Sequence, residues 1–285
     1  MQKTFGKRMV RLLVGLLFLF LILVFCYCEN NLITTSEYEV ASDKLSKDFD
    51  GTVIIHVSDL HNKLFGENQG RLIKKIKEQN PDMIVITGDL IDSNHPDVEK
   101  GLLFVAEAVK IAPVYFVTGN HDNWLSDTNT YQLFRGLEQL GVTVLDDETR
   151  KITVGEGYIR LWGLDDDTQA LKSKVREVLT EMEEEAHDSE PAFTLLLAHE
   201  PQVFPVYAEF DVDLVLSGHA HGGQFRIPFI GGFVAPDQGF LPEYTKGLYE
   251  ENGTLMIVSA GLGNSVIPQR LLNRPELVKI TLKCK

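Results

Sequence analysis

A nearly continuous apolar run that ends in a glycine and a carboxylate constrains the fold of this chain more than any other feature. Residues 83–87 are Met-Ile-Val-Ile-Thr, and Gly88-Asp89 follow directly. Such a run is typical of a strand buried on both faces, most often in a parallel sheet covered by helices. Ligands of such sheets bind beyond the carboxyl ends of the strands, so we expect Asp89 to face a binding site.

Apolar runs followed by polar residues recur along the chain. Amphipathic segments typical of helices separate the first runs, at residues 68–80, 98–111 and 130–140. This alternation predicts a parallel or mixed α/β sheet. The expected strands, besides 83–87, are residues 52–57, 114–118, 193–198, 214–217, 254–258 and 277–282.

The order of the elements changes after residue 150. Residues 151–154 and 158–163 are expected to form a hairpin, and residues 170–185 a strongly charged helix. The inward face of that helix is expected to begin at Leu171, because apolar residues follow it at helical spacing. The second half of the chain is therefore predicted to add strands of mixed direction to the fold.

An apolar segment near the amino terminus predicts a membrane anchor. Residues 12–28 form an unbroken stretch of 17 residues, at the lower limit for a helix that spans a bilayer. The segment ends without an Ala-x-Ala pattern, so an uncleaved anchor is favoured over a secretory signal peptide. All basic residues of this region precede the run and Glu29 follows it, which predicts a cytoplasmic tail and an extracytoplasmic body.

The charge balance argues against one class of function. The formal net charge is −14, and the chain after residue 28 has a charge of −18, because the first 28 residues hold four basic and no acidic residues. Non-specific nucleic-acid binding needs Lys and Arg to neutralise phosphates, so no nucleic-acid partner is expected. The cysteines, at positions 26, 28 and 284, form neither a disulfide framework nor a zinc-binding spacing.

Five polar clusters stand where predicted strands end. Each alone is a weak signal, but their common position at strand ends indicates one pocket. Imidazole, carboxylate and amide groups without a thiolate suit manganese, iron or zinc. His56, His95 and His187 lie outside these clusters and are interpreted as ordinary side chains. The clusters are Asp59-x-His61, Gly88-Asp89, Gly119-Asn120-His121-Asp122, His199 and Gly218-His219-Ala220-His221.

This set resembles the calcineurin-like metallophosphoesterase family, whose pattern is D-x-H, G-D, G-N-H-D/E, H and G-H-x-H. All blocks occur here in order, and the resemblance covers about residues 51–282. His199-Glu200-Pro201 and the residues from His221 to Gln224 are similar to the membrane-anchored bacterial subgroup. That subgroup includes enzymes linked to UDP-diacylglucosamine hydrolysis in lipid A synthesis.

The resemblance implies a four-layer α/β/β/α sandwich with two mixed β-sheets, and the apolar run adds one transmembrane helix before it. The chain is therefore expected to divide into a cytoplasmic tail and anchor at residues 1–28, a linker with the strand that leads into the body at 29–50, and a metallophosphoesterase domain at 51–285. The resemblance also implies two divalent metal ions, manganese first, with iron or zinc as alternatives. By the family pattern, Asp59, His61 and His221 hold one ion, Asn120, His199 and His219 hold the other, and Asp89 bridges them.

The reaction implied by the family is attack of a metal-bridging hydroxide on phosphorus. His121 is then expected to bond the phosphate or to protonate the leaving oxygen. Asp122 has two interpretations that the sequence leaves open: it orients His121, or it caps a helix.

The expected activity is hydrolysis of a phosphodiester or pyrophosphate by a membrane-anchored enzyme. A lipid-linked substrate agrees with the anchor, and a UDP-diacylglucosamine pyrophosphohydrolase role in lipid A synthesis is a rival hypothesis. That hydrolysis takes place on the cytoplasmic side, which conflicts with the orientation predicted from charge. Two different classes of protein also fit the pattern: a membrane-tethered binding protein with structural metals, and a nuclease. The negative charge disfavours the nuclease.

Residues 224–249 combine aromatic and aliphatic side chains with glycines and prolines. One interpretation is a packed irregular loop. The second interpretation is an apolar rim that receives an acyl chain or docks on a bilayer. Arg226 and Lys246 are the nearest candidates to meet an anionic substrate.

Overall fold

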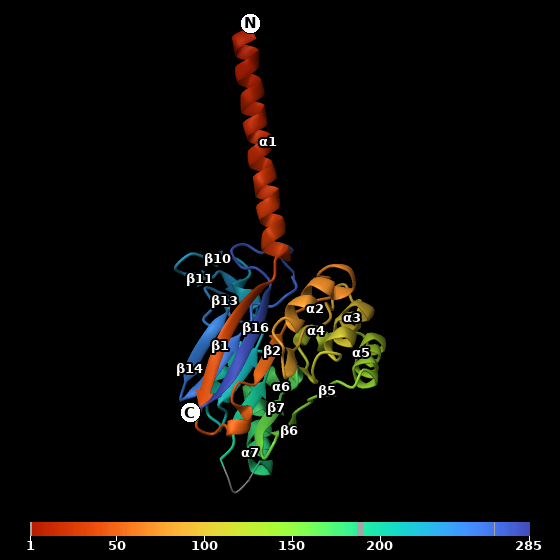
Figure 1. Ribbon diagram of the computed structural model, residues 1–285, viewed down its shortest axis with the longest axis vertical. Helices are drawn as coiled ribbons and strands as arrows, with labels where there is room; N and C mark the ends of the chain where they lie inside the picture. Colours follow the sequence, from red (N-terminus) through yellow and green to blue (C-terminus); the bar gives the residue numbers. More distant parts are fainter. Residues whose placement is uncertain (1, 187–190, 265) are drawn as a thin grey trace.

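The structure, a computed structural model, describes residues 2–186, 191–264 and 266–285, and His187 lies outside them. Figure 1 shows a compact body from which one long helix, α1 (Gln2–Asn31), projects. The body holds two six-stranded sheets. Two short hairpins, β10–β11 and β12–β13, accompany them.

The first sheet has the strand order β1-β16-β2-β3-β4-β5. Adjacent strands in this sheet are parallel, except that β16 and β2 are antiparallel to each other, so the sheet is mixed. β16 therefore separates β1 from β2, although β1 and β2 are consecutive in the chain. The bounds are β1 Thr34–Ser42, β2 Val53–Val57, β3 Met83–Thr87, β4 Val114–Val117, β5 Thr143–Val144 and β16 Glu276–Cys284.

The second sheet has the order β14-β15-β9-β8-β7-β6. Its four central strands are parallel, and antiparallel hairpins close both edges. The hairpin expected around residues 155–157 is thus confirmed as β6–β7. The bounds are β6 Glu148–Val154, β7 Gly157–Gly163, β8 Thr194–Leu197, β9 Leu214–Ser217, β14 Gly247–Glu251 and β15 Thr254–Val258.

Three apolar clusters hold the layers together. The cluster between the sheets joins residues such as Val85 of β3 to Leu195 of β8. A second cluster packs α2, α3 and α5 on the outer face of the first sheet, and a third packs α7 and α8 on the outer face of the second. Each fully buried aliphatic side chain contributes about 1.5–3 kcal/mol to folding. The four-layer α/β/β/α sandwich with two mixed sheets is confirmed.

The helices and short hairpins have the following bounds: α2 Gly70–Lys77, α3 Val98–Ala108, α4 Asn120–Asn123, α5 Asp127–Gln139, α6 Asp166–Gln169, α7 Lys172–Glu185, α8 Phe204–Tyr207, β10 Arg226–Ile227, β11 Gly231–Gly232, β12 Val234–Ala235 and β13 Gly239–Phe240. Single turns of 3-10 helix are η1 Lys47–Phe49, η2 Glu67–Gln69, η3 Pro201–Val203 and η4 His221–Gly223.

The helix expected over residues 170–185 is present as α7, but it starts two residues later, at Lys172, after the separate short helix α6. α6 ends at Gln169, and Leu171 takes an extended backbone at the start of α7, with φ −126° and ψ 104°. Its side chain is 61% exposed, so the expectation that it faces inward was wrong. A residue that precedes the first turn does not share the face that the helical spacing defines, and the inward face starts at Val175 instead.

The helix α1 is long and apolar enough to cross a membrane over Lys7–Asn31. Its last turn is joined directly to the body. Glu29 is buried, accepts a hydrogen bond from the backbone N–H of Asn273 at 3.1 Å, and pairs with Arg274 Nε at 2.8 Å. β1 begins three residues after the helix ends, at Thr34.

Candidate dimetal centre

The polar clusters predicted from sequence converge at the carboxyl ends of strands from both sheets. Asp59 and His61 follow β2, Asp89 follows β3, and the Gly218–His221 segment follows β9. Several of these residues have a left-handed backbone, with φ 51° at Asp59, 46° at His61, 52° at Asp89 and 47° at His221. Such conformations cost on the order of 1–3 kcal/mol each and gather at functional sites.

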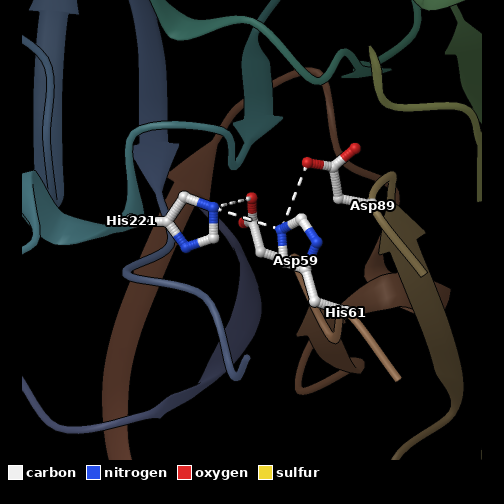
Figure 2. Close-up of side chains that lie close together, drawn as sticks. All are labelled: Asp59, His61, Asp89 and His221. Carbon is white, nitrogen blue, oxygen red and sulfur yellow. Dashed lines mark hydrogen bonds and ion pairs between the residues drawn. The ribbon is translucent and has the colours of Figure 1, made fainter. Parts of the chain in front are cut away.

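The first group of candidate ligands consists of Asp59, His61, Asp89 and His221. Figure 2 shows the four side chains pointing toward one another. His61 Nε2 lies 3.2 Å from His221 Nε2 and 3.3 Å from Asp89 Oδ2, and His221 Nε2 lies 3.4 Å from Asp59 Oδ1. Burial lowers the pKa of His61 and lowers the pKa of His221 strongly. Neutral imidazole is the form that binds a metal ion.

The second group consists of Asp89, His199 and His219, with the side-chain amide of Asn120 beside them. His219 Nδ1 lies 3.0 Å from Asn120 Oδ1 and 3.2 Å from His199 Nε2, and Asn120 Oδ1 lies 3.2 Å from His199 Nε2. The far nitrogens of both rings face acceptors: His199 Nδ1 faces the Thr87 carbonyl at 2.8 Å, and His219 Nε2 faces Asp237 Oδ2 at 2.9 Å.

Those outer hydrogen bonds fix where the ring protons are. If His199 Nδ1 and His219 Nε2 each hold a proton for their acceptors, the inner nitrogens present lone pairs. His199 Nε2, His219 Nδ1 and Asn120 Oδ1 then form a triangle of acceptors with no hydrogen to share. Such a triangle needs a positive charge, so these residues fit a metal cation. Without one, burial lowers the pKa of His199, but the carboxylates around it, Asp89 first, together raise that pKa well above its ordinary value.

Asp89 stands between the two groups. Its Oδ2 lies 3.3 Å from His61 Nε2 and 3.5 Å from His199 Nε2, and its Oδ1 accepts the backbone N–H of His121 at 2.8 Å. Burial alone would raise the pKa of Asp89, but the imidazoles of His199 and His61 hold it below its ordinary value. One ionised carboxylate thus serves both ligand sets, as a bridging ligand must.

His121 lies beside the first group, with its ring centroid 4.6 Å from that of His61. Its Nδ1 is 2.9 Å from Ser93 Oγ and 3.3 Å from Asp92 Oδ1. Among the described residues none is hydrogen-bonded to Nε2, which is therefore free to meet a substrate. The backbone N–H of Ser93 also donates to Nδ1, at 3.2 Å, so Asp92 and Ser93 together hold the ring through this nitrogen. The sequence patterns did not predict this role, although Asp92 lies three residues after Asp89 on the same loop.

Asp122 does not contact the His121 side chain. Its carboxylate accepts the backbone N–H groups of Gly119 at 3.1 Å and Ile91 at 3.1 Å, and the bond from Gly119 caps the start of α4. The interpretation in which Asp122 orients His121 was wrong, because α4 turns the two neighbouring side chains in different directions. Burial, helped by the charge of Asp89, raises the pKa of Asp122 to about 7.

Asp237 is a second residue that the sequence analysis missed. It belongs to the segment between β12 and β13, and its carboxylate holds His219 Nε2. A partner of this kind fixes the orientation of a metal-binding imidazole. Arg226 and Lys246, considered as contacts for an anionic substrate, have protein partners instead: Arg226 donates to the Gly222 carbonyl at 2.8 Å, and Lys246 pairs with Glu276 at 2.7 Å.

Glycines allow the strand ends to approach closely enough for these groups to meet. A Cβ atom at residue 88 would lie 2.5 Å from Gly119 Cα and 2.7 Å from His199 Nδ1, and Gly88 has φ +77°. We expect Gly88→Ala to lower the free energy of unfolding by about 2–5 kcal/mol, the sum of overpacking and a left-handed alanine. Urea unfolding measures this change.

Gly141→Ala is the matched control for that substitution. Gly141 has the same φ of +77°, but a Cβ there would meet nothing within 4 Å. We expect a loss of only about 1–2 kcal/mol, from the backbone alone. Equal losses for the two variants would contradict the close packing at residue 88.

Comparison with known proteins agrees with this geometry. The sequence profile of the family named Metallophos, calcineurin-like phosphoesterase, matches residues 52–223. The metallophosphoesterase YkuE of Bacillus subtilis is 32% identical over 90% of this chain and 88% of its own. A metallophosphoesterase of Aquifex aeolicus is 29% identical over 92% of this chain and 96% of its own.

A third relative carries a membrane description in its name. The transmembrane protein with metallophosphoesterase domain of Danio rerio is 29% identical over 87% of this chain and 56% of its own length. The profile match extends over more than half of the chain and includes all the converging strand ends. The chain belongs to the calcineurin-like metallophosphoesterase family.

Proposed function

We propose that this protein hydrolyses a phosphodiester or pyrophosphate bond with the help of two divalent metal ions. Asp59, His61 and His221 would hold one ion. Asn120, His199 and His219 would hold the other, with Asp89 shared. The observation that carries the proposal is the triangle of acceptors formed by His199 Nε2, His219 Nδ1 and Asn120 Oδ1, which only a positive charge stabilises. Nitrogen and oxygen donors without a thiolate favour manganese, with iron or zinc as alternatives.

Two bound divalent ions supply Lewis acidity, which activates the attacking water and neutralises charge on the phosphoryl oxygens. The remaining chemistry belongs to the chain. As the water oxygen bonds to phosphorus, the bond from phosphorus to the leaving oxygen breaks, and that oxygen needs a proton. His121 can donate it from Nε2, because its other nitrogen, Nδ1, accepts the backbone N–H of Ser93 at 3.2 Å and faces Asp92 at 3.3 Å.

The amino-terminal helix extends the proposal to the membrane. We infer that residues 1–28 are a cytoplasmic tail and a transmembrane anchor, that 29–50 lead from the anchor into the first sheet through β1, and that 51–285 hold the rest of the hydrolase domain. The apolar length of α1 supports an anchor. The basic residues before the apolar run support a body on the extracytoplasmic side.

A lipid-linked phosphoester or pyrophosphate is the substrate class that the surroundings of the site favour. An apolar cavity of about 190 Å³ adjoins His221, between β12 and residues 266–267. Its walls include Val234, Ala235 and Ile267, which offer an apolar chain a place next to the candidate ligands. A pyrophosphohydrolase role on a glycolipid precursor is the related alternative, and it requires a cytoplasmic body.

The test is hydrolysis by the full chain in detergent, stripped of metal and then supplied with manganese, iron, zinc or magnesium. We expect cleavage only with metal. Bis-p-nitrophenyl phosphate should be cleaved faster than p-nitrophenyl phosphate, because the first is a diester, the proposed kind of substrate, and the second is a monoester. Metal content is measured on the same samples. Two bound ions without cleavage of either ester would contradict a general phosphodiesterase and favour a tethered binding protein with structural metals.

A further inference from the structure

A group of exposed apolar side chains lies at the end of the body from which α1 projects. Phe229 and Ile230, at the turn between β10 and β11, are fully exposed and 64% exposed. Phe240 of β13 is 75% exposed and Leu241 after it is 62% exposed, and Leu271 and Leu272 are exposed as well. We call these six residues the junction patch. Surface apolar groups gathered in this way mark interaction sites rather than chance exposure.

Hydrogen bonds join the residues just before Leu271 of the junction patch to the end of α1. Gln269 Nε2 donates to the carbonyl of Cys26 at 3.1 Å, and Asn30 Nδ2 donates to the carbonyl of Pro268 at 2.8 Å. The same segment holds β10, because the N–H of Arg226 donates to the Leu271 carbonyl at 3.0 Å. In the view of Figure 1, β10, β11 and β13 are drawn toward the end of the body from which α1 projects.

The chain leaves no spacer between the apolar helix and the body. The apolar run ends at Cys28, and Glu29, the next residue, is already buried against Asn273 and Arg274. If the apolar run lies in the hydrocarbon core, the body must therefore begin at the level of the lipid headgroups. Side chains at the same end of the body then reach that level too.

We propose that the junction patch inserts into the interface of the lipid bilayer that α1 spans, which rests on the proposed role of α1 as an anchor. Tyr side chains favour this level of a membrane, and Phe and Leu insert there from the apolar faces of interfacial segments. Phe229 and Phe240 supply such side chains from the body, and Tyr27, 61% exposed, supplies one from α1. The patch is thus proposed to bind lipid. Its three segments, residues 229–230, 240–241 and 271–272, would each contact the bilayer.

This placement also puts the apolar cavity at His221 close to the bilayer surface. Val266, which lines that cavity and is 83% exposed, belongs to the same connection between β15 and β16 as Leu271 and Leu272. A docked junction patch brings this connection to the bilayer surface. An amphiphilic phosphoester can then extend its apolar part into the cavity while its phosphate stays beside the candidate ligands.

The experiment measures contact with lipid directly. Full-length Phe229→Trp is reconstituted in phosphatidylcholine vesicles with or without bromine atoms on the acyl chains, and tryptophan emission is compared. We expect brominated lipid to quench this variant more than the native chain, which has only Trp124 and Trp162. Leu171→Trp is the matched control: Leu171 is about as exposed as Ile230 but precedes α7, far from α1 in Figure 1, and should gain no quenching.

Ile230→Trp repeats the test at the neighbouring position and should behave like Phe229→Trp. Equal quenching of the patch variants and Leu171→Trp, in chains that float with the vesicles, overturns the docking. So does cross-linking that shows a second copy of the chain over the patch. Chains that do not float with vesicles overturn the anchor and the docking together. Cleavage of a soluble diester, assayed in the same samples, tests the hydrolase proposal independently of either result.

Discussion

Asp89→Asn is expected to lower kcat/KM for a phosphodiester by about 10³-fold or more. Removal of one pre-organised hydrogen-bond donor typically costs about 10²–10³-fold, and Asp89 is expected to contribute at least that much. The reason is its position: the carboxylate lies within 3.5 Å of imidazoles from both ligand groups. An amide lacks the negative charge that two cations would share. Steady-state kinetics with saturating manganese, together with the metal content of the variant, measure the effect.

The fold should survive this substitution. Asn adopts the left-handed backbone that residue 89 requires almost as readily as Asp. Asp127→Asn, at an exposed position in the first turn of α5, is the matched control and should retain full activity. If Asp89→Asn instead keeps its activity, the shared-ligand role is wrong. If it only lowers the melting temperature, and the native chain shows no hydrolysis, the metals are structural.

His121→Ala is expected to reduce kcat by about 10²–10⁴-fold for diesters with alkyl leaving groups, the usual contribution of a general acid. With p-nitrophenolate the loss should be much smaller, because that oxygen leaves without a proton. His121 is not among the proposed ligands, so the metal content should be unchanged. The measurement is a plot of rate against leaving-group pKa for the native chain and the variant.

The slope of that plot separates the two roles considered for His121. A loss that is equal for good and poor leaving groups would mean that the imidazole binds the phosphate and does not protonate the leaving oxygen. Normal rates with alkyl esters would contradict both roles. In that case the contact of His121 with Asp92 and Ser93 would be structural only.

The sequence predicted the architecture and the membership of the site because both depend on local patterns. Buried strands such as 83–87 are visible as apolar runs, and the carboxyl ends of parallel strands meet at one edge. The family and the layered fold were therefore predicted correctly. The seven candidate ligands were also named from sequence, and the structure brings all of them together, whereas their role as ligands stays a prediction.

Side-chain directions and partners between distant segments could not be predicted in this way. Whether Asp92 or Asp122 faces His121 depends on how the first turn of α4 is oriented. The contact of Asp237 with His219 crosses from an irregular segment whose sequence shows no periodicity. The exposure of Leu171 follows from a break between α6 and α7 that the apolar spacing does not reveal.

The place of β16 between β1 and β2 also determines when the first sheet can be completed during synthesis. β1 emerges from the ribosome directly after α1, but its nine paired partners, Glu276 to Cys284, are translated more than 230 residues later. Until those residues leave the ribosome, the nascent chain holds an unpaired strand edge, a state prone to mispairing. A chain cut short before residue 276 would leave β1 without this neighbour.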